Sequence, residues 1–538
     1  MTRNAEIYLW ALVLLSSAAA ASRGQPHIVL IVADDLGWND VSWHNPQVVT
    51  PHLEDLARRV ILEQSYVQPI CTPTRSALLT GRYPFTLGRQ HSVLKDNEPT
   101  GLTLNATLLP QSLKEVGYST HAVGKPFLHV SHPYPPYSSP HPQHLFASYV
   151  EDLLTSRTRF VLPSRAAPLM VPEEYMKPYD HIQDLDRRTY LGMVTAMDEA
   201  VGRVVAALKS SGHYEDSVIV FTTDNGGPTK HGANNWPLRG YKTTLWEGGT
   251  RGAAFIHSPL LPNPGAVSHK MIHVTDWYQT LVGLAGGVAP GDTDGFDQWA
   301  SLTSSAPSPR TQLIYNLDDT DKFKAGIRVG DMKLLINPGN AGWTPPPESE
   351  PTNQEPPHSQ ATKTETSSSK KYTPAKSYEN SLYAEGDKSE SWNHARRGRS
   401  SPGRKTMLQL NHELMEREST LVEGPYEDLQ AVPQSKDQAG FGSDVAPNQD
   451  KSSISENFDG KDDLKLDYFF RNVDIQLYNI KDDPDERVDL SKIESDTVED
   501  LLQTLLKEMP RYVAADIKPG DPGAHPKHWN NIWSPGWC

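Results

Sequence analysis

Two stretches of the chain have the hydrophobic pattern of buried parallel strands. The segments "HIVLIVADD" (residues 27–35) and "SVIVFTTDNGG" (residues 217–227) are apolar, β-branched runs that end in acidic or amide residues. Between them, residues 191–208 place apolar side chains at helical spacing, and Gly212 ends that pattern. Strand, helix and strand in this order predict an α/β domain with a mainly parallel sheet flanked by helices.

The pattern changes after this domain. The segment "AGIRVGDMKLLIN" predicts a hairpin that turns at Gly330 and Asp331, and "DIQLYNIKDDPDERVDL" and "DTVEDLLQTLLKEM" predict a later strand and helix. Between these parts, a long stretch rich in Ser, Glu, Lys, Pro and Gln lacks hydrophobic periodicity, which is typical of disorder or of an exposed insertion. We therefore expect a catalytic domain over residues 23–310, a smaller C-terminal α+β domain over 311–344 and 465–538, and an insertion over 345–464.

The N-terminal segment "MTRNAEIYLWALVLLSSAAAASRGQ" combines a basic residue, a short apolar core and a run of small residues. This pattern predicts a secretory signal peptide over residues 1–22, and the alternative is a buried N-terminal helix. The apolar run is well short of the ~20 residues that a membrane span needs, and no later segment qualifies. With a net charge of −15, the chain has no general nucleic-acid-binding face. We expect a protein of the secretory pathway with no membrane span.

Asn105 begins the only N-glycosylation sequon of the chain, Asn105-Ala-Thr107. A turn that stays unmodified is the alternative interpretation. Because we expect the chain to be secreted, we predict that Asn105 carries a glycan.

The chain has only two cysteines, Cys71 and Cys538. A disulfide between them is possible by count, and a lone cysteine is usually a small buried hydrophobe. However, Cys71 lies in the run "ICTPTRSALLTGRYP", in which Pro and Arg residues lead into a turn. We predict that Cys71 is kept for its chemistry and is not bridged to Cys538.

Acidic and amide side chains follow both predicted strands: Asp34 and Asp35 follow the first, and Asp224 and Asn225 follow the second. The carboxyl ends of parallel strands meet at one edge of a sheet, where functional residues gather. Each pair alone also fits a capping or turn role. Two such ends in one sheet, with Cys71 between them in the chain, favour a site for a hard cation, because Ca²⁺ and Mg²⁺ prefer oxygen ligands.

The element Cys71-x-Pro73-x-Arg75, followed by "SALLTGRYP", resembles the consensus of the sulfatases, in which the cysteine is oxidised to formylglycine in the endoplasmic reticulum. The segments "VADDLGWND", "GYSTHAVGK", "FTTDNGG" and "NNWPLRGYKTTLWEGGTRG" then occur in the order of that family. The segment "VPEEYMKPYDHIQ" is similar to the arylsulfatase B group. The resemblance covers about residues 26–340 and again from 474 onward, and it implies the alkaline-phosphatase-like sulfatase fold.

The resemblance also implies an activity, which is the hydrolysis of sulfate esters. Residue 71 would be hydrated formylglycine, of which one hydroxyl attacks sulfur, and loss of the proton of the other hydroxyl then releases sulfate. The implied substrate is 4-sulfated N-acetylgalactosamine in glycosaminoglycans, or an aryl sulfate, and the implied maturation partner is the formylglycine-generating enzyme. The implied location is the lysosome or the extracellular space. The implied roles are Ca²⁺ binding by Asp34, Asp35, Asp224, Asn225 and residue 71, stabilisation of the hydrated aldehyde by Arg75, and sulfate contacts by Lys125 and Lys242.

The sequence departs from the family pattern where relatives carry two active-site histidines. Phe127 and Ala166 occupy these two positions, and neither side chain can transfer a proton. Loss of a general acid typically costs about 10²- to 10⁴-fold in rate. Three interpretations stay open: a nearby histidine substitutes, turnover is weak or absent, or the sequence lacks a segment between Lys125 and Val171. The histidines in that stretch, which also fit an exposed loop, are His129, His132, His141 and His144.

We keep sulfate-ester hydrolysis as the main hypothesis. A phosphodiesterase or phosphonate hydrolase of the same fold is one alternative. The alternative of a different class is a secreted protein that binds sulfated glycans without hydrolysing them.

Overall fold

The computed structural model describes residues 24–95, 97–122, 169–262, 264–348, 473–524 and 528. The predicted signal peptide and nearly all of the predicted insertion lie outside these residues. So do the following residues singled out in the sequence: Lys125, Phe127, His129, His132, His141, His144, Ala166 and Cys538.

The larger sheet has five strands in the order β1-β4-β5-β2-β6. Strands β1 and β4 are parallel, and their pairing runs from His27 opposite Ser217 to Ala33 opposite Thr223. Strand β5 is antiparallel to both of its neighbours, so the sheet is mixed. The strands are β1 (His27–Ala33), β4 (Ser217–Thr223), β5 (Ala254–His257), β2 (Val60–Leu62) and β6 (Ala266–Ser268).

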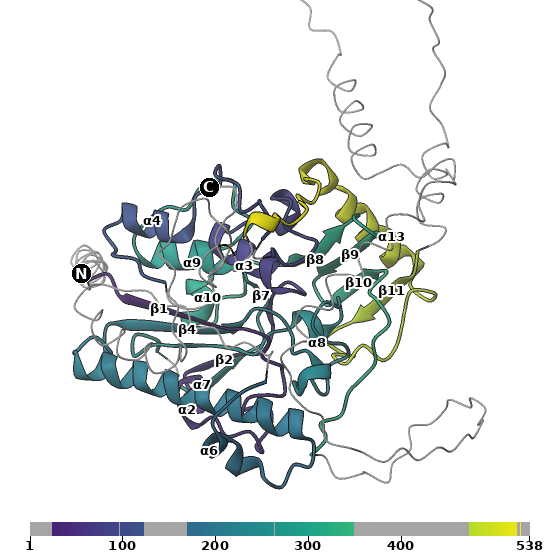
Figure 1. Ribbon diagram of the computed structural model, residues 1–538. Coiled ribbons are helices and arrows are strands. Elements are labelled where there is room, and N and C mark those ends of the chain that lie inside the picture. Colours follow the sequence, from purple (N-terminus) through teal and green to yellow (C-terminus); the bar gives the residue numbers. More distant parts are fainter. Residues whose placement is uncertain are drawn as a thin grey trace, which may run out of the picture. The chain divides into compact units, whose positions relative to one another are not determined.

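Helices cover both faces of this sheet (Figure 1). Successive side chains of β1 point to opposite faces, so Val29 and Ile31 join a core cluster with helix α7 (Leu185–Ser210), whereas Ile28 and Leu30 join a second cluster. The second cluster contains side chains of helices α3 (Cys71–Thr80), α4 (Leu109–Glu115) and α9 (Asp276–Leu284). Helix α2 (Pro51–Ala57) packs beside α7. The predicted α/β architecture is therefore confirmed.

Helix α7 is the long helix that the apolar spacing predicted. Asp184 caps it, because its carboxylate accepts a hydrogen bond of 2.8 Å from the backbone N–H of Arg187. Among the described residues, no helix combines the length and the apolar character that crossing a membrane requires.

The second sheet is antiparallel and has the order β11-β10-β9-β8. Its strands are β8 (Gln312–Asp318), β9 (Lys324–Val329), β10 (Met332–Ile336) and β11 (Ile475–Asn479). The predicted hairpin at Gly330 and Asp331 joins β9 to β10. Strand β11 pairs with β10, with Ile475 opposite Ile336, so the chain on either side of the predicted insertion meets in one sheet. Helix α13 (Ser495–Leu506) contributes apolar side chains to the core of this sheet.

The described residues contain several shorter elements. They are the strand pair β3 (Ser65–Tyr66) and β7 (Ile272–His273), the helices α6 (Glu173–Met176), α8 (Glu247–Thr250) and α10 (Trp299–Thr303), and the 3-10 helices Pro84–Thr86, Lys177–Tyr179, Thr229–His231, Met509–Arg511 and Pro522–Ala524.

A buried ion cluster connects the second sheet to helix α8. The ammonium of Lys333, on β10, lies 2.8 Å from a carboxylate oxygen of Glu247 and 2.7 Å from one of Glu486, and all three side chains are fully buried. Buried charges of this kind are costly unless they are paired, so each depends on the others. The cluster fixes the start of α8 and with it the end of the preceding loop, residues 238–246.

Candidate active site

The side chains that follow β1 and β4 meet in the structure. Because these strands are parallel and in register, Asp34 and Asp224 leave the same edge of the sheet, and the backbone N–H of Asp224 donates to the carbonyl of Ala33 at 2.9 Å. Asp34, Asp35, Cys71 and Asp224 each place one oxygen or sulfur atom within 4.8 Å of the others, and all four residues are buried.

The backbone of Asp35 has a φ of 63°, in the left-handed region that few non-glycine residues adopt. Its carboxylate accepts a hydrogen bond of 2.8 Å from the Asn225 side-chain amide. Unusual backbone conformations of this kind cluster at functional sites, where the surrounding structure holds them.

Cys71 is the first residue of α3, and its sulfur lies 4.0 Å from a carboxylate oxygen of Asp35. Burial raises the pKa of this thiol strongly, and the neighbouring carboxylates of Asp224 and Asp34 raise it further. The thiol therefore stays protonated at neutral pH. A protonated thiol is a poor nucleophile, so this position is unsuited to ordinary cysteine catalysis.

Arg75 lies one helical turn after Cys71, so both side chains leave the same face of α3. Its Nη2 donates to Asp34 at 2.8 Å, and Nε and Nη2 donate to one oxygen of Asp224 at 2.9 and 2.7 Å. The buried guanidinium thus fixes the orientation of two carboxylates that come from different strands.

The site still contains an excess of negative charge. Burial, followed by repulsion from Asp34, raises the pKa of Asp224 to about 7. In addition, Oδ1 of Asn225 is a buried acceptor without a hydrogen-bond partner in the described part of the chain. Three carboxylates and an unused amide oxygen are the donors that a hard cation prefers, so these residues fit Ca²⁺ or Mg²⁺.

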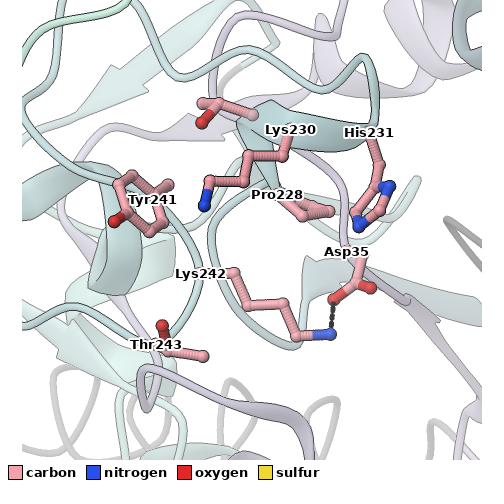
Figure 2. A pocket seen from close by; sticks show the side chains of 8 residues that line it. Asp35, Pro228, Lys230, His231, Tyr241, Lys242 and Thr243 are labelled. Carbon is pink, nitrogen blue, oxygen red and sulfur yellow. Dashed lines mark ion pairs between the residues drawn. The ribbon is translucent and has the colours of Figure 1, made fainter. Parts of the chain in front are cut away.

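A pocket of about 340 Å³ opens beside this cluster (Figure 2). Lys242 lines it, and its ammonium forms an ion pair of 2.5 Å with Asp35. The next residue, Thr243, has a φ of 77°, which is strained for a β-branched side chain, and its backbone N–H donates to the carbonyl of Pro69 at 2.7 Å. Close backbone contact also fixes the loop after β4, because a Cβ on Gly226 would lie 1.8 Å from the carbonyl oxygen of Gly248.

The structure thus brings together most of the site residues proposed from the sequence. These are Asp34, Asp35, Cys71, Arg75, Asp224, Asn225 and Lys242. Lys125 is not among the described residues. Asn105, the predicted glycosylation site, is exposed in a loop before α4. The sequence analysis did not single out the pocket-lining residues Lys230, His231 and Tyr241. Their position within a few residues of "DNGG" and Lys242 is the signal that points to them.

Comparison with known proteins places this arrangement in a family. The sulfatase family profile matches residues 26–147 and 127–288, two segments that overlap over 127–147. Arylsulfatase J of Mus musculus is 36% identical over 402 residues, which cover 61% of this chain and 67% of that protein. N-acetylgalactosamine-6-sulfatase of Canis lupus familiaris is 26% identical over 381 residues, which cover 57% of this chain and 73% of that protein.

A solved structure shares the fold. The crystal structure of Ps i-CgsB in complex with k-i-k-neocarrahexaose superposes with a TM-score of 0.61 and 20% sequence identity, over 92% of this chain and 95% of that one. This likeness concerns the fold alone, whereas the profile and the curated relatives concern the family. The chain belongs to the sulfatase family, whose activity is the hydrolysis of sulfate esters.

Proposed function

We propose that this protein hydrolyses sulfate esters by means of a formylglycine formed from Cys71 and a Ca²⁺ ion held at the end of strands β1 and β4. One observation carries the proposal: Cys71 is buried among three carboxylates, where its own thiol stays protonated. The position suits a residue that is modified before it reacts. Formylglycine supplies the hydroxyl of a hydrated aldehyde as nucleophile, and that group does not depend on a thiolate.

The proposed ligands of the cation are the carboxylates of Asp34, Asp35 and Asp224, the Oδ1 atom of Asn225 and the oxygen of modified residue 71. A bound Ca²⁺ would supply Lewis acidity, which lowers the pKa of a bound hydroxyl and screens the charge of sulfate. The unpartnered amide oxygen of Asn225 and the raised pKa of Asp224 both support the proposed binding of a cation at this place.

The other residues of the site are proposed to orient the carboxylates and to stabilise the negative charge of sulfate. Arg75 holds Asp34 and Asp224 in fixed positions, and its location one turn from residue 71 lets its guanidinium support the hydrated aldehyde. Lys242 presents an ammonium at the pocket wall, where it can stabilise the negative charge of sulfate oxygens. Lys125 is proposed as a second sulfate contact on the resemblance alone.

As substrate we propose 4-sulfated N-acetylgalactosamine in glycosaminoglycans. The similarity of "VPEEYMKPYDHIQ" to the arylsulfatase B group supports this choice, and a relative named N-acetylgalactosamine-6-sulfatase supports a sulfated amino sugar. The proposal places the protein in the lysosome or outside the cell, after modification by the formylglycine-generating enzyme and glycosylation at the exposed Asn105.

A second candidate function is a secreted protein that binds sulfated glycans without turnover. Phe127 and Ala166 occupy the positions of two family histidines. Neither side chain can transfer a proton, and this favours the second candidate function.

The proposed function is tested with purified protein produced together with the formylglycine-generating enzyme. We expect release of sulfate from a small aryl sulfate, and faster release from 4-sulfated than from 6-sulfated chondroitin disaccharides. Absence of turnover on every ester, together with saturable binding of chondroitin sulfate and formylglycine at residue 71 in peptide mass spectrometry, would contradict hydrolysis and support the binding protein.

Calcium is expected to stabilise the protein more strongly at pH 7.5 than at pH 5. The folded-state pKa of Asp224, about 7, lies above its ordinary value of 3.8. In metal-free protein this carboxyl therefore takes up a proton on folding between these values, and its contribution to the free energy of unfolding falls as pH rises through that window. Ca²⁺ needs the deprotonated carboxylate and competes with this proton.

Thermal unfolding with and without Ca²⁺ at both pH values measures this effect. At about 100 times its Kd, the ion contributes roughly 2.7 kcal/mol. We expect the pH-dependent increment to be lost in Asp224→Asn, and Asp292→Asn, at an exposed carboxylate paired with Arg82, serves as the matched control. An equal increase in melting temperature with Ca²⁺ at both pH values would contradict binding at Asp224. The same holds if Ca²⁺ raises the melting temperature of Asp224→Asn as much as that of the wild type.

A further inference from the structure

The loop that carries the proposed metal ligands of β4 lies against the backbone of helix α8. The backbone N–H of Gly226, next to Asn225, donates to the carbonyl of Gly249 at 3.0 Å. A Cβ on Gly226 would lie 1.8 Å from the carbonyl oxygen of Gly248, so no side chain separates the loop from the helix. The position of α8 therefore constrains the backbone of Asp224 and Asn225.

The loop that carries Lys242 closes over the same helix. The backbone N–H of Gly248 donates to the carbonyl of Arg239 at 2.7 Å. A Cβ on Gly249 would lie 2.2 Å from the carbonyl oxygen of Thr244. These contacts come from both sides of Lys242 in the chain. Helix α8 is thus the common support of the proposed cation ligands and of the proposed sulfate contact.

The first residue of α8, Glu247, holds the helix through groups that the proposed reaction does not use. One oxygen of its buried carboxylate lies 2.8 Å from the ammonium of Lys333, and the other accepts a hydrogen bond of 2.9 Å from the hydroxyl of Tyr66. Its backbone N–H donates to Glu486 at 2.7 Å, and the second oxygen of Glu486 lies 2.7 Å from Lys333. Each oxygen of the two carboxylates has a partner, so the cluster specifies the position of α8 relative to β10.

The ammonium of Lys333 is the charge on which the cluster depends. Burial raises the pKa of the Glu486 carboxyl, Lys333 opposes this rise, and repulsion from Glu247 adds to it. Arg251 provides Glu247 with a further cation at 3.8 Å. A buried ion cluster often stabilises a fold no more than apolar side chains of the same volume, whereas its directional contacts can specify a single arrangement. A role in positioning therefore accounts for these charges better than a role in stability.

We propose that Lys333 is a positioning residue for the active site, which through α8 holds the loop after β4 and the loop of Lys242 together. The inference rests on the proposed function, because it assumes that these loops carry the cation ligands and the sulfate contact. Strand β10 of the second sheet then supports the site, although Lys333 is fully buried and does not line the pocket. Without the ammonium, the carboxylates of Glu247 and Glu486 repel each other, and α8 is expected to move away from both loops.

The test replaces Lys333 by methionine, which has a similar length and no charge. Hydrogen–deuterium exchange in metal-free protein, read by mass spectrometry of peptides that cover residues 224–227 and 239–249, reports how firmly both loops are held. We expect exchange at these loops to be about tenfold faster in Lys333→Met than in the wild type, because their hydrogen bonds to α8 open more often.

Two further measurements connect this movement to the site. The affinity for Ca²⁺, measured by calorimetry, is expected to fall about tenfold in Lys333→Met, since loss of groups that orient metal ligands typically costs about 10- to 100-fold. At saturating Ca²⁺, kcat for an aryl sulfate is expected to stay about tenfold lower, because Lys242 is displaced as well. Glu247→Gln should weaken Ca²⁺ binding about threefold. It keeps the volume and leaves Lys333 paired with Glu486, so it provides a folded variant even where Lys333→Met does not fold.

The matched control is Leu505→Ala, which removes apolar contacts between helix α13 and the same sheet but leaves all three charged side chains in place. In this variant, exchange at the two loops and the affinity for Ca²⁺ should equal those of the wild type. The same changes in Leu505→Ala as in Lys333→Met would overturn the inference, because they would show only a loss of stability.

Wild-type exchange at both loops in the folded variants would also overturn the inference, as would an unchanged affinity for Ca²⁺ despite faster exchange. Failure of the proposed function is read separately, from the absence of aryl sulfate hydrolysis and of Ca²⁺ binding in the wild type. The exchange measurement needs neither turnover nor Ca²⁺, so it decides whether Lys333 holds the two loops in either case.

Discussion

Replacing Cys71 by alanine is expected to abolish the hydrolysis of an aryl sulfate, with a loss of at least about 10³-fold in kcat. The proposed nucleophile is made from this side chain, and alanine cannot be converted to an aldehyde. The remaining cluster of Asp34, Asp35 and Asp224 retains the carboxylates for a cation but offers no group that attacks sulfur. Turnover is measured with protein produced in the presence of the formylglycine-generating enzyme, and peptide mass spectrometry reports the state of residue 71.

The matched control for this variant is Thr72→Ser. Thr72 is the adjacent residue, is also buried, and accepts a hydrogen bond of 3.0 Å from the backbone N–H of Leu94, which serine can accept as well. Thr72→Ser keeps the Cys-x-Pro-x-Arg element, so modification and turnover should both persist. Turnover that survives in Cys71→Ala would contradict residue 71 as the nucleophile. Full activity with an unmodified thiol would contradict formylglycine.

The part of the site that could be predicted from the sequence is the part that regular structure positions. Strands β1 and β4 each contain an unbroken apolar run, residues 28–33 and 218–221, because both faces of the sheet are covered by helices, and such runs are easily recognised. Parallel pairing in register then places Asp34 beside Asp224 without further information. The direction of each strand was harder to predict. Strand β5 is antiparallel to β4, but its four residues, "AFIH", contain nothing that sets a direction.

The pocket wall could not be predicted, because it depends on contacts between loops. Lys230 and His231 lie in a polar segment between two glycine-containing turns, a pattern typical of exposed loops. Their location at the pocket follows from the contact of that segment with the loop of Lys242.

Glu348 is a similar case, at the edge of the low-complexity stretch. Its carboxylate is buried and pairs at 2.8 Å with Arg187 of helix α7. Composition alone gives no sign of this contact, since a buried ion pair depends on a partner far away in the chain.

The role of Arg75 also becomes clear only in three dimensions, and it leads to the largest expected effect on stability. Arg75→Ala is expected to lower the free energy of unfolding of the metal-free protein by about 3–5 kcal/mol, because it leaves the carboxylates of Asp34 and Asp224 buried without a compensating charge. Arg75→Lys should be intermediate, since an ammonium keeps the charge but cannot donate to both carboxylates in the fixed geometry of the guanidinium. Denaturant unfolding without Ca²⁺ measures both variants.

The control for this measurement is Arg82→Ala. Arg82 lies just after the same helix, and its guanidinium pairs at 3.1 Å with the exposed carboxylate of Asp292. Its effect should stay within about 1 kcal/mol, as for other exposed pairs. Added Ca²⁺ should narrow the difference between Arg75→Ala and the wild type, because the ion compensates the same carboxylates. A deficit that Ca²⁺ leaves unchanged would mean that Arg75 and the ion do not share these ligands. If metal-free Arg75→Ala is as stable as the metal-free wild type, the carboxylates at the ends of β1 and β4 are neutral when the arginine is absent.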